Sequence, residues 1–220
     1  MKYLDKDKYT QMIAELRERI LSAELLSNDR NYVFIESTSL QIRKILELIA
    51  YLSILANGDK LNSKERMDYH AKNIIENLET KATLFYPFPS YIIPPEESGG
   101  EPTLIPIGYA NALSQSEFSA MYQLCGNILH AQHPLKCDVD IENVITKNKH
   151  TLRKLKQLLS YHTVGIKKEE DKYTFLHVEI DFSNSENTRA STIREYNSRI
   201  FSERQLLTIF QYGLGEVVCS

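Results

Sequence analysis

The stretch YVFIESTSLQIRKILELIAYLSILA, residues 32–56, decides the fold class because it is the longest and most apolar helix candidate in the chain. Its apolar residues recur at three- and four-residue steps and cover more than one side of a helix, which is typical of a helix buried by several neighbours. The following Asn57–Gly58 pair is a common helix end. Arg43, Lys44 and Glu47 interrupt the apolar run, which is shorter than the roughly 20 residues that a bilayer span needs. The stretch therefore predicts the central helix of a bundle.

Outward from this helix, the same periodicity predicts four more helices. They cover residues 7–27, residues 63–81, a segment that starts at Ser114 or Ser116 and ends before Pro134, and residues 140–160. Glu117 follows Ser114 by three residues, as in a capping box. Six of the seven prolines fall between residues 86 and 108, which predicts a long loop or a short extended hairpin that acts as a lid or a partner-binding arm.

The period changes after residue 160, where β-branched and aromatic residues alternate with polar ones around a Glu-Glu-Asp turn. This pattern predicts a β-hairpin. Residues 200–218 fit either a last helix or a returning strand. The predicted fold is α+β and mainly helical, with a bundle over residues 1–160 and a small β-rich C-terminal extension over residues 161–220.

The composition excludes several classes of protein. With 42% hydrophobic and 25% charged residues the chain is an ordinary globular one, and its net charge of −3 excludes a body that binds nucleic acid by bulk charge. Three cysteines without a CxxC pair and a charged N-terminal sequence predict reduced thiols in the cytoplasm. The motifs GxxxxGK[ST], GxGxxG, GxSxG and HExxH do not occur, so P-loop and zincin chemistry are excluded and no cofactor is expected.

A cluster of Cys125, His130, His133 and Cys137 raises the question of a zinc site. On a helix the five-residue step from Cys125 to His130 rotates the side chains by about 140°, so these two do not converge and only the histidines share a face. We therefore predict no metal site. The alternative is that Cys125 packs in the core while the histidines bind carbonyls at the helix end. The same geometry argues against a Cys–His nucleophile pair.

Glu36, Arg43 and Glu47 are seven and four residues apart and fall on nearly one line of the central helix. A buried charge needs a partner, so Arg43 and Glu47 are predicted to form an internal salt bridge. A functional alternative is that this line faces Asn127 and His130 across the core, where it builds a small polar pocket together with His133.

The segment KNKHTLRKLK, residues 147–156, contains five basic residues and no acidic one. Such clusters bind phosphates with release of counterions, although a solvated helix face produces the same pattern. The candidate nucleic-acid-binding residues are Lys147, Lys149, Arg153, Lys154 and Lys156.

The segments LQIRKILELIAYLSILAN (residues 40–57) and FSAMYQLCGNILHAQHP (residues 118–134) together resemble bacterial helical proteins related to the HEPN superfamily, over roughly residues 33–159. The resemblance implies a helical bundle, often dimeric, of the kind found in toxin–antitoxin and antiviral systems. Many members are metal-independent ribonucleases with an Arg, four to six further residues and a His, and His130 or His133 matches that histidine. The matching arginine positions hold Cys125 and Gly126 instead, so the motif is broken.

The resemblance thus implies a non-catalytic HEPN-like interaction module in a bacterial anti-phage or toxin–antitoxin system. It would form a homodimer and bind a further protein partner or RNA, and no contact with a membrane is expected. One alternative is a metal-independent ribonuclease that uses His130, with Asn127 and Arg43 positioning the phosphate. Another is a small-ligand sensor with the proline-rich segment as its lid. The ribonuclease requires a solvent-accessible His130 in a basic cleft, whereas the module expects His130 to be buried or to cap a helix.

Overall fold

The structure is a computed structural model that describes residues 4–95, 102–130, 140–169, 172–183 and 191–197. Four long helices agree with the sequence analysis: α1 (Lys6–Leu26), α2 (Tyr32–Asn57), α5 (Gln115–Ile128) and α6 (Ile141–Ser160). Asp5, Asn31, Ser114 and Asp140 are their N-caps. The capping box of Ser114 and Glu117 is confirmed, because side chains satisfy backbone groups at this helix start in both directions.

The prediction of one continuous helix over residues 63–81 is wrong. The segment forms a short helix α3 (Ser63–Arg66) and a second helix α4 (Ala71–Glu79), which follow the 3-10 turn η1 (Gly58–Lys60). Between α3 and α4 the Asp68 carboxylate accepts a hydrogen bond of 2.8 Å from the backbone N–H of His70. Asp side chains that bond to the backbone in this way compete with helical hydrogen bonds, which explains the break.

The β structure is larger than the predicted hairpin. The described residues contain a five-stranded antiparallel sheet in the order β2-β1-β3-β4-β5. Its strands are β1 (Phe88–Ile93), β2 (Thr103–Pro106), β3 (Tyr161–Glu169), β4 (Lys172–Ile180) and β5 (Ser191–Asn197). The hairpin predicted after residue 160 is β3–β4. The proline-rich segment forms the β1–β2 hairpin, which was one of its two predicted forms, and the polar run after β4 supplies β5. Residues 200–218 lie outside the described residues.

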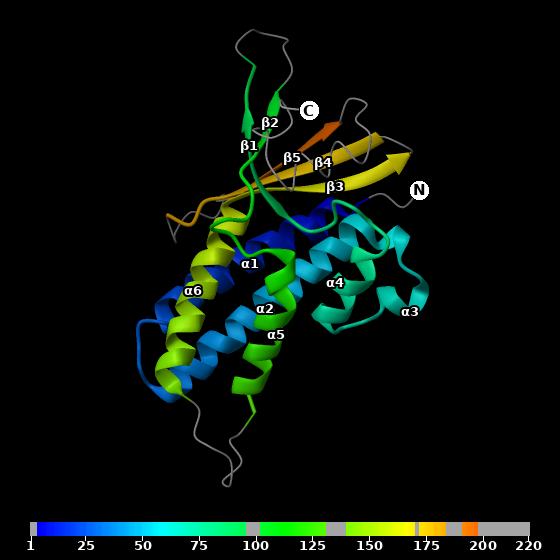
Figure 1. The fold of residues 1–220 in the computed structure, drawn as a ribbon. Coiled ribbons are helices and arrows are strands. Elements are labelled where there is room, and N and C mark those ends of the chain that lie inside the picture. Colours follow the sequence, from blue (N-terminus) through cyan, green and yellow to red (C-terminus); the bar gives the residue numbers. More distant parts are fainter. Residues whose placement is uncertain (1–3, 96–101, 131–139, 170–171, 184–190, 198–220) are drawn as a thin grey trace, which may run out of the picture.

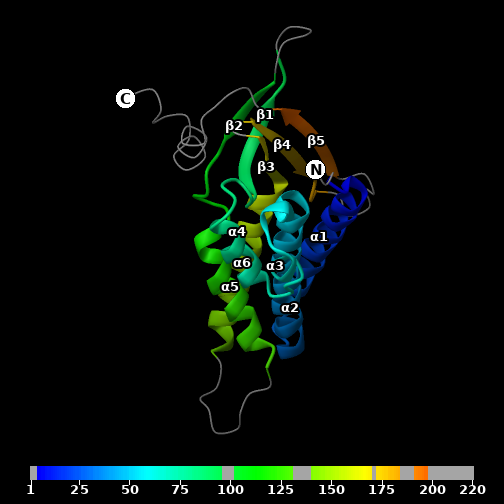
Figure 2. The ribbon, with the colours of Figure 1, turned by 90° about the vertical axis from the view of Figure 1, so that its right-hand side faces the viewer.

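The sheet lies at one end of the helix bundle, and the β1–β2 hairpin projects beyond it (Figures 1 and 2). One hydrophobic core joins the two parts, because it contains Ile49 and Leu158 from the helices and Leu176 and Val178 from β4. The amide of Asn57, at the end of α2, also donates to the backbone oxygen of Gly165 in β3 at 3.2 Å. The division into two parts at residue 160 stays a prediction, and this packing crosses it. No helix of the described part is long and apolar enough to span a membrane.

Candidate functional site

An open pocket of about 630 Å³ lies between α2, α4 and α5. Three helices supply its lining: α2 contributes Arg43, the start of α4 contributes His70, Lys72 and Asn73, and α5 with its C-terminal end contributes Tyr122, Gln123, Gly126, Asn127 and His130. Arg43, Asn127 and His130, which the sequence analysis proposed as catalytic residues, therefore border one cavity although they are distant in sequence.

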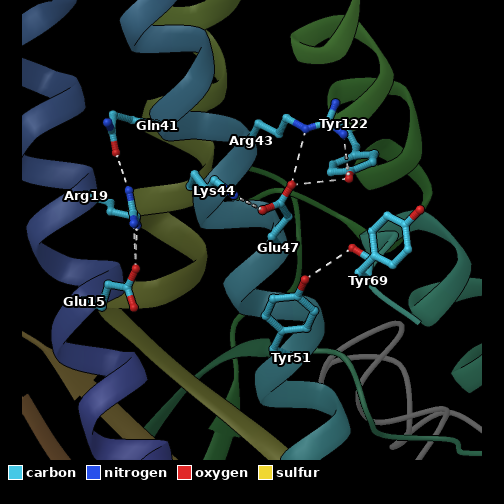
Figure 3. A network of polar contacts seen from close by, with 9 residues as sticks. All are labelled: Glu15, Arg19, Gln41, Arg43, Lys44, Glu47, Tyr51, Tyr69 and Tyr122. Atoms are coloured by element: carbon cyan, nitrogen blue, oxygen red, sulfur yellow. Dashed lines mark hydrogen bonds and ion pairs between the residues drawn. The ribbon is translucent and has the colours of Figure 1, made fainter. Parts of the chain in front are cut away.

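Arg43 is fixed in place by α2 and α5 together (Figure 3). Its Nε atom donates to Oε1 of Glu47 at 3.3 Å, which confirms the predicted i,i+4 salt bridge, and its Nη2 atom donates to the Tyr122 hydroxyl at 2.8 Å. The guanidinium also lies 4.2 Å from the centre of the Tyr122 ring, a distance that permits a cation–π interaction. These contacts hold the arginine charge at the pocket wall.

The pocket wall keeps a positive charge in spite of this salt bridge. The side chain of Glu47 is only 13% exposed and also accepts from Lys44 at 2.7 Å, so one carboxylate is shared by two cations. The Tyr122 hydroxyl completes the cluster by donating to Oε1 of Glu47 at 3.4 Å. Burial raises the pKa of Tyr122, with Arg43 opposing the rise, so the phenol stays protonated at neutral pH and can donate.

Asn127 and His130 lie exposed at the C-terminal end of α5, whereas Cys125 on the same helix is buried. Burial raises the pKa of the Cys125 thiol to about 12. A thiol in this state is a poor nucleophile. Because Cys125 is buried and His130 is exposed, the two side chains diverge as their spacing predicted. The exposed position of His130 is the one that the ribonuclease alternative requires.

Sequence reasoning missed His70 and Lys72, which form the α4 side of the pocket. Two contacts hold the backbone just before α4: the Tyr51 hydroxyl donates to the Tyr69 backbone oxygen at 3.2 Å (Figure 3), and the Asp68 carboxylate accepts from the backbone N–H of His70. The Lys72 side chain forms an ion pair of 3.7 Å with Glu76. No local pattern marks these residues, because only the break between α3 and α4 turns this segment toward α5.

Other residues proposed from the sequence are not brought to this pocket. Glu36 does not line it, and Glu47 acts only through Arg43 and Tyr122. His133 lies outside the described residues. None of the five basic residues of α6 lines it either: Lys154 is paired with Glu117 and Lys156 with Glu24, while Lys147, Lys149 and Arg153 are exposed elsewhere on the surface.

The described residues hold no group of three or more His, Cys, Asp or Glu side chains arranged to bind a metal ion. Cys137 and His133, which belong to the cluster that the sequence analysis considered for zinc and rejected, are not among those residues. The proline-rich segment does not border the pocket in its described part, residues 86–95 and 102–108, so this placement gives no support to a lid over it.

No family model, curated protein or solved structure matches this chain. The resemblance to the HEPN superfamily therefore stays a prediction.

Proposed function

We propose that the protein is a metal-independent endoribonuclease whose active site is the pocket between α2, α4 and α5. The observation that carries the proposal is the convergence of Arg43, Asn127 and His130 on one open cavity. Lys72 adds a second cation, and no carboxylate occurs among the described residues that line the cavity. A lining of this kind suits the negatively charged phosphodiester of a nucleic acid.

The reaction that fits this lining is internal transesterification of RNA. The 2′-oxygen attacks the neighbouring phosphorus, a P–O2′ bond forms and the P–O5′ bond breaks, which leaves a 2′,3′-cyclic phosphate and a 5′-hydroxyl. The proton of the 2′-hydroxyl must be removed and the 5′-oxygen must receive one, and an imidazole such as that of His130 performs such transfers near neutral pH. Arg43 stabilises the charge that builds up on the phosphate oxygens.

Arg43 occupies the role that the arginine of the broken motif plays in the HEPN resemblance. It reaches the pocket from a different helix, α2, and is held there by Tyr122 from α5. An arginine fixed before the substrate arrives stabilises a transition state well, because no reorganisation is needed when the charge develops. The HEPN-like assignment and the homodimer stay part of this proposal.

The test is cleavage of labelled total RNA and tRNA by the purified protein with and without EDTA. The parent protein is expected to cleave in both conditions and to leave 2′,3′-cyclic phosphate ends. His130→Ala should lower the rate by on the order of 10²- to 10⁴-fold. His150→Ala is the matched control, because His150 is exposed on α6 and does not line the pocket. Absence of cleavage by a correctly folded parent protein contradicts the proposal.

The second candidate is the non-catalytic interaction module of an anti-phage or toxin–antitoxin system. The pairing of Arg43 with Glu47 favours it, because part of the arginine charge is already neutralised inside the protein. In that case the exposed cations Lys147, Lys149 and Arg153 on α6 are the candidate contacts for an anionic partner. This candidate expects RNA or protein binding that is unaffected by His130→Ala, without cleavage.

A further inference from the structure

The proposed reaction needs two proton transfers, one from the 2′-hydroxyl and one to the 5′-oxygen, and a single imidazole can perform only one of them at a time. His130 is one candidate group. The pocket contains a second imidazole, that of His70, which belongs to a different helix and comes from a part of the sequence with no recognisable motif. Two histidines from two different helices that line one cavity can serve the two oxygens of an in-line displacement.

We propose that His70 is the general base that removes the proton of the 2′-hydroxyl, and that His130 is the general acid that protonates the 5′-oxygen. This inference rests on the proposed ribonuclease function and assigns the chemistry within the same pocket. It makes the nucleophile a ribose hydroxyl, so the substrate class is RNA and DNA is excluded from cleavage.

The surroundings of His70 suit a base. The Asp68 carboxylate accepts from the backbone N–H of His70 at 2.8 Å and from the Asn73 amide at 3.1 Å, so it is anchored beside the imidazole. The pKa of Asp68 is lowered, first by the hydrogen bond from the His70 backbone and also by its charge interaction with His70. The negative charge of Asp68 thus interacts favourably with the positive charge that the imidazole acquires when the base takes its proton.

The position of the His70 side chain is also defined. It precedes α4 as the N-cap residue without making a capping hydrogen bond, so its imidazole is not used by the helix. Its ring packs against the Tyr69 ring with the centroids 4.3 Å apart. The Tyr69 backbone is in turn tied to α2 by the Tyr51 hydroxyl (Figure 3). An exposed ring on a braced backbone can reach a bound substrate without a large conformational change.

His130 is the other imidazole of the pocket and comes from the end of α5. His130 follows the last residue of α5, Ile128, by two positions and is exposed at the pocket. Because the Asp68 carboxylate lies beside His70, we assign the base to His70, and His130 on the other helix is then the imidazole that can protonate the 5′-oxygen.

The experiment compares two RNA oligonucleotides that differ at one linkage, which carries either the normal 5′-oxygen or a bridging 5′-sulfur. A thiolate leaves without a proton, because thiols are far more acidic than alcohols. Loss of the general acid should therefore leave the cleavage rate of the sulfur substrate nearly unchanged, whereas loss of the general base should still lower it. The proteins to test are the parent, His70→Ala, His130→Ala and the control His150→Ala, each checked for folding by circular dichroism.

We expect His70→Ala and His130→Ala each to lose on the order of 10²- to 10⁴-fold in rate on the oxygen substrate. On the sulfur substrate His130→Ala should recover to near the parent rate, while His70→Ala should stay slow. Full activity of a folded His70→Ala on the oxygen substrate overturns this inference but leaves the ribonuclease proposal intact. Recovery of the His70→Ala cleavage rate on the sulfur substrate also overturns the assignment of His70 as the general base. A parent protein that cleaves neither substrate overturns both proposals.

Discussion

The Nη1 atom of Arg43 lies 2.6 Å from the point at which a Cβ atom would stand on Gly126. Atoms of side chains do not approach this closely, so the guanidinium occupies space that only a glycine leaves open. This close contact packs α2 against α5 at the pocket wall. It explains why a glycine occupies position 126 inside a helix, although glycine lowers helix stability by about 1 kcal/mol relative to alanine.

Gly126→Ala is therefore expected to displace Arg43 from the pocket wall. The arginine end is flexible, so we expect the free energy of unfolding to change by less than about 1 kcal/mol, because better helix propensity offsets the lost contacts. Cleavage of RNA should fall at least tenfold, since Arg43 loses the geometry set by Tyr122 and Glu47. The measurements are urea denaturation and the cleavage rate.

The matched control for this change is Gly58→Ala. Gly58 has a helical φ of −66°. A Cβ atom added to it would lie 3.2 Å from a side-chain carbon of Ile54, and neither residue lines the pocket. This variant should keep the parent cleavage rate. Equal rates for Gly126→Ala and the parent would mean that the position of Arg43 does not matter for the reaction.

His162 should make the stability of the fold depend on pH. The side chain is buried in β3, and burial lowers the pKa of its imidazole from 6.5 to about 4. Below about pH 6.5 the unfolded chain binds a proton that the folded protein does not bind until about pH 4. The free energy of unfolding is therefore unaffected by this titration above pH 6.5. It falls as the pH decreases toward 4, by about 3 kcal/mol in total.

The check is urea denaturation of the parent and His162→Gln at several pH values from 7 to 4.5. The glutamine variant should show a flatter decline in the free energy of unfolding, because the amide does not titrate. His177, a second buried histidine with a lowered pKa, is present in both proteins, so the difference between the two curves isolates His162. Parallel curves for the two proteins would show that His162 does not cause the decline.

Cys125 should resist alkylation in the folded protein. Its side chain is 2% exposed, and burial raises the pKa of its thiol to about 12, so almost no thiolate forms at pH 8. Iodoacetamide should modify Cys125 only after urea is added. Peptide mapping by mass spectrometry distinguishes it from Cys137 and Cys219. Rapid modification of Cys125 without urea would place its thiol at the surface and reopen the question of a Cys125–His130 pair.

Much of the helical layer follows from local sequence. The apolar periodicity of α1, α2, α5 and α6 and the box of Ser114 with Glu117 are properties of short segments, and the structure confirms them. The Arg43–Glu47 salt bridge is also local, since residues four apart are neighbours on any helix. The divergence of Cys125 and His130 follows from the same helical geometry.

The sheet was predicted only in part, because strand pairing depends on distant partners. The β3–β4 hairpin has a turn and alternating residues within one segment. The sequence of β5 is mostly polar and has no clear strand pattern. The strand forms because it pairs with β4, for example Arg194 with His177, and this pairing exists only in the folded chain. The prolines of β1 and β2 lower the strand propensity of their segment, yet these strands pair with each other and β1 pairs with β3 at Phe88 and Pro89.

Local sequence patterns were sufficient to predict the long helices, the β3–β4 hairpin and three of the residues that line the pocket, because periodicity and spacing act over a few turns. Only the tertiary structure decided that Arg43 meets Asn127 and His130, and that His70 and Lys72 join them. The break at Asp68 orients the start of α4, and the contact of Arg43 with Tyr122 joins α2 to α5. Contacts between segments that are far apart in sequence depend on the packing of the whole core, which no local pattern encodes.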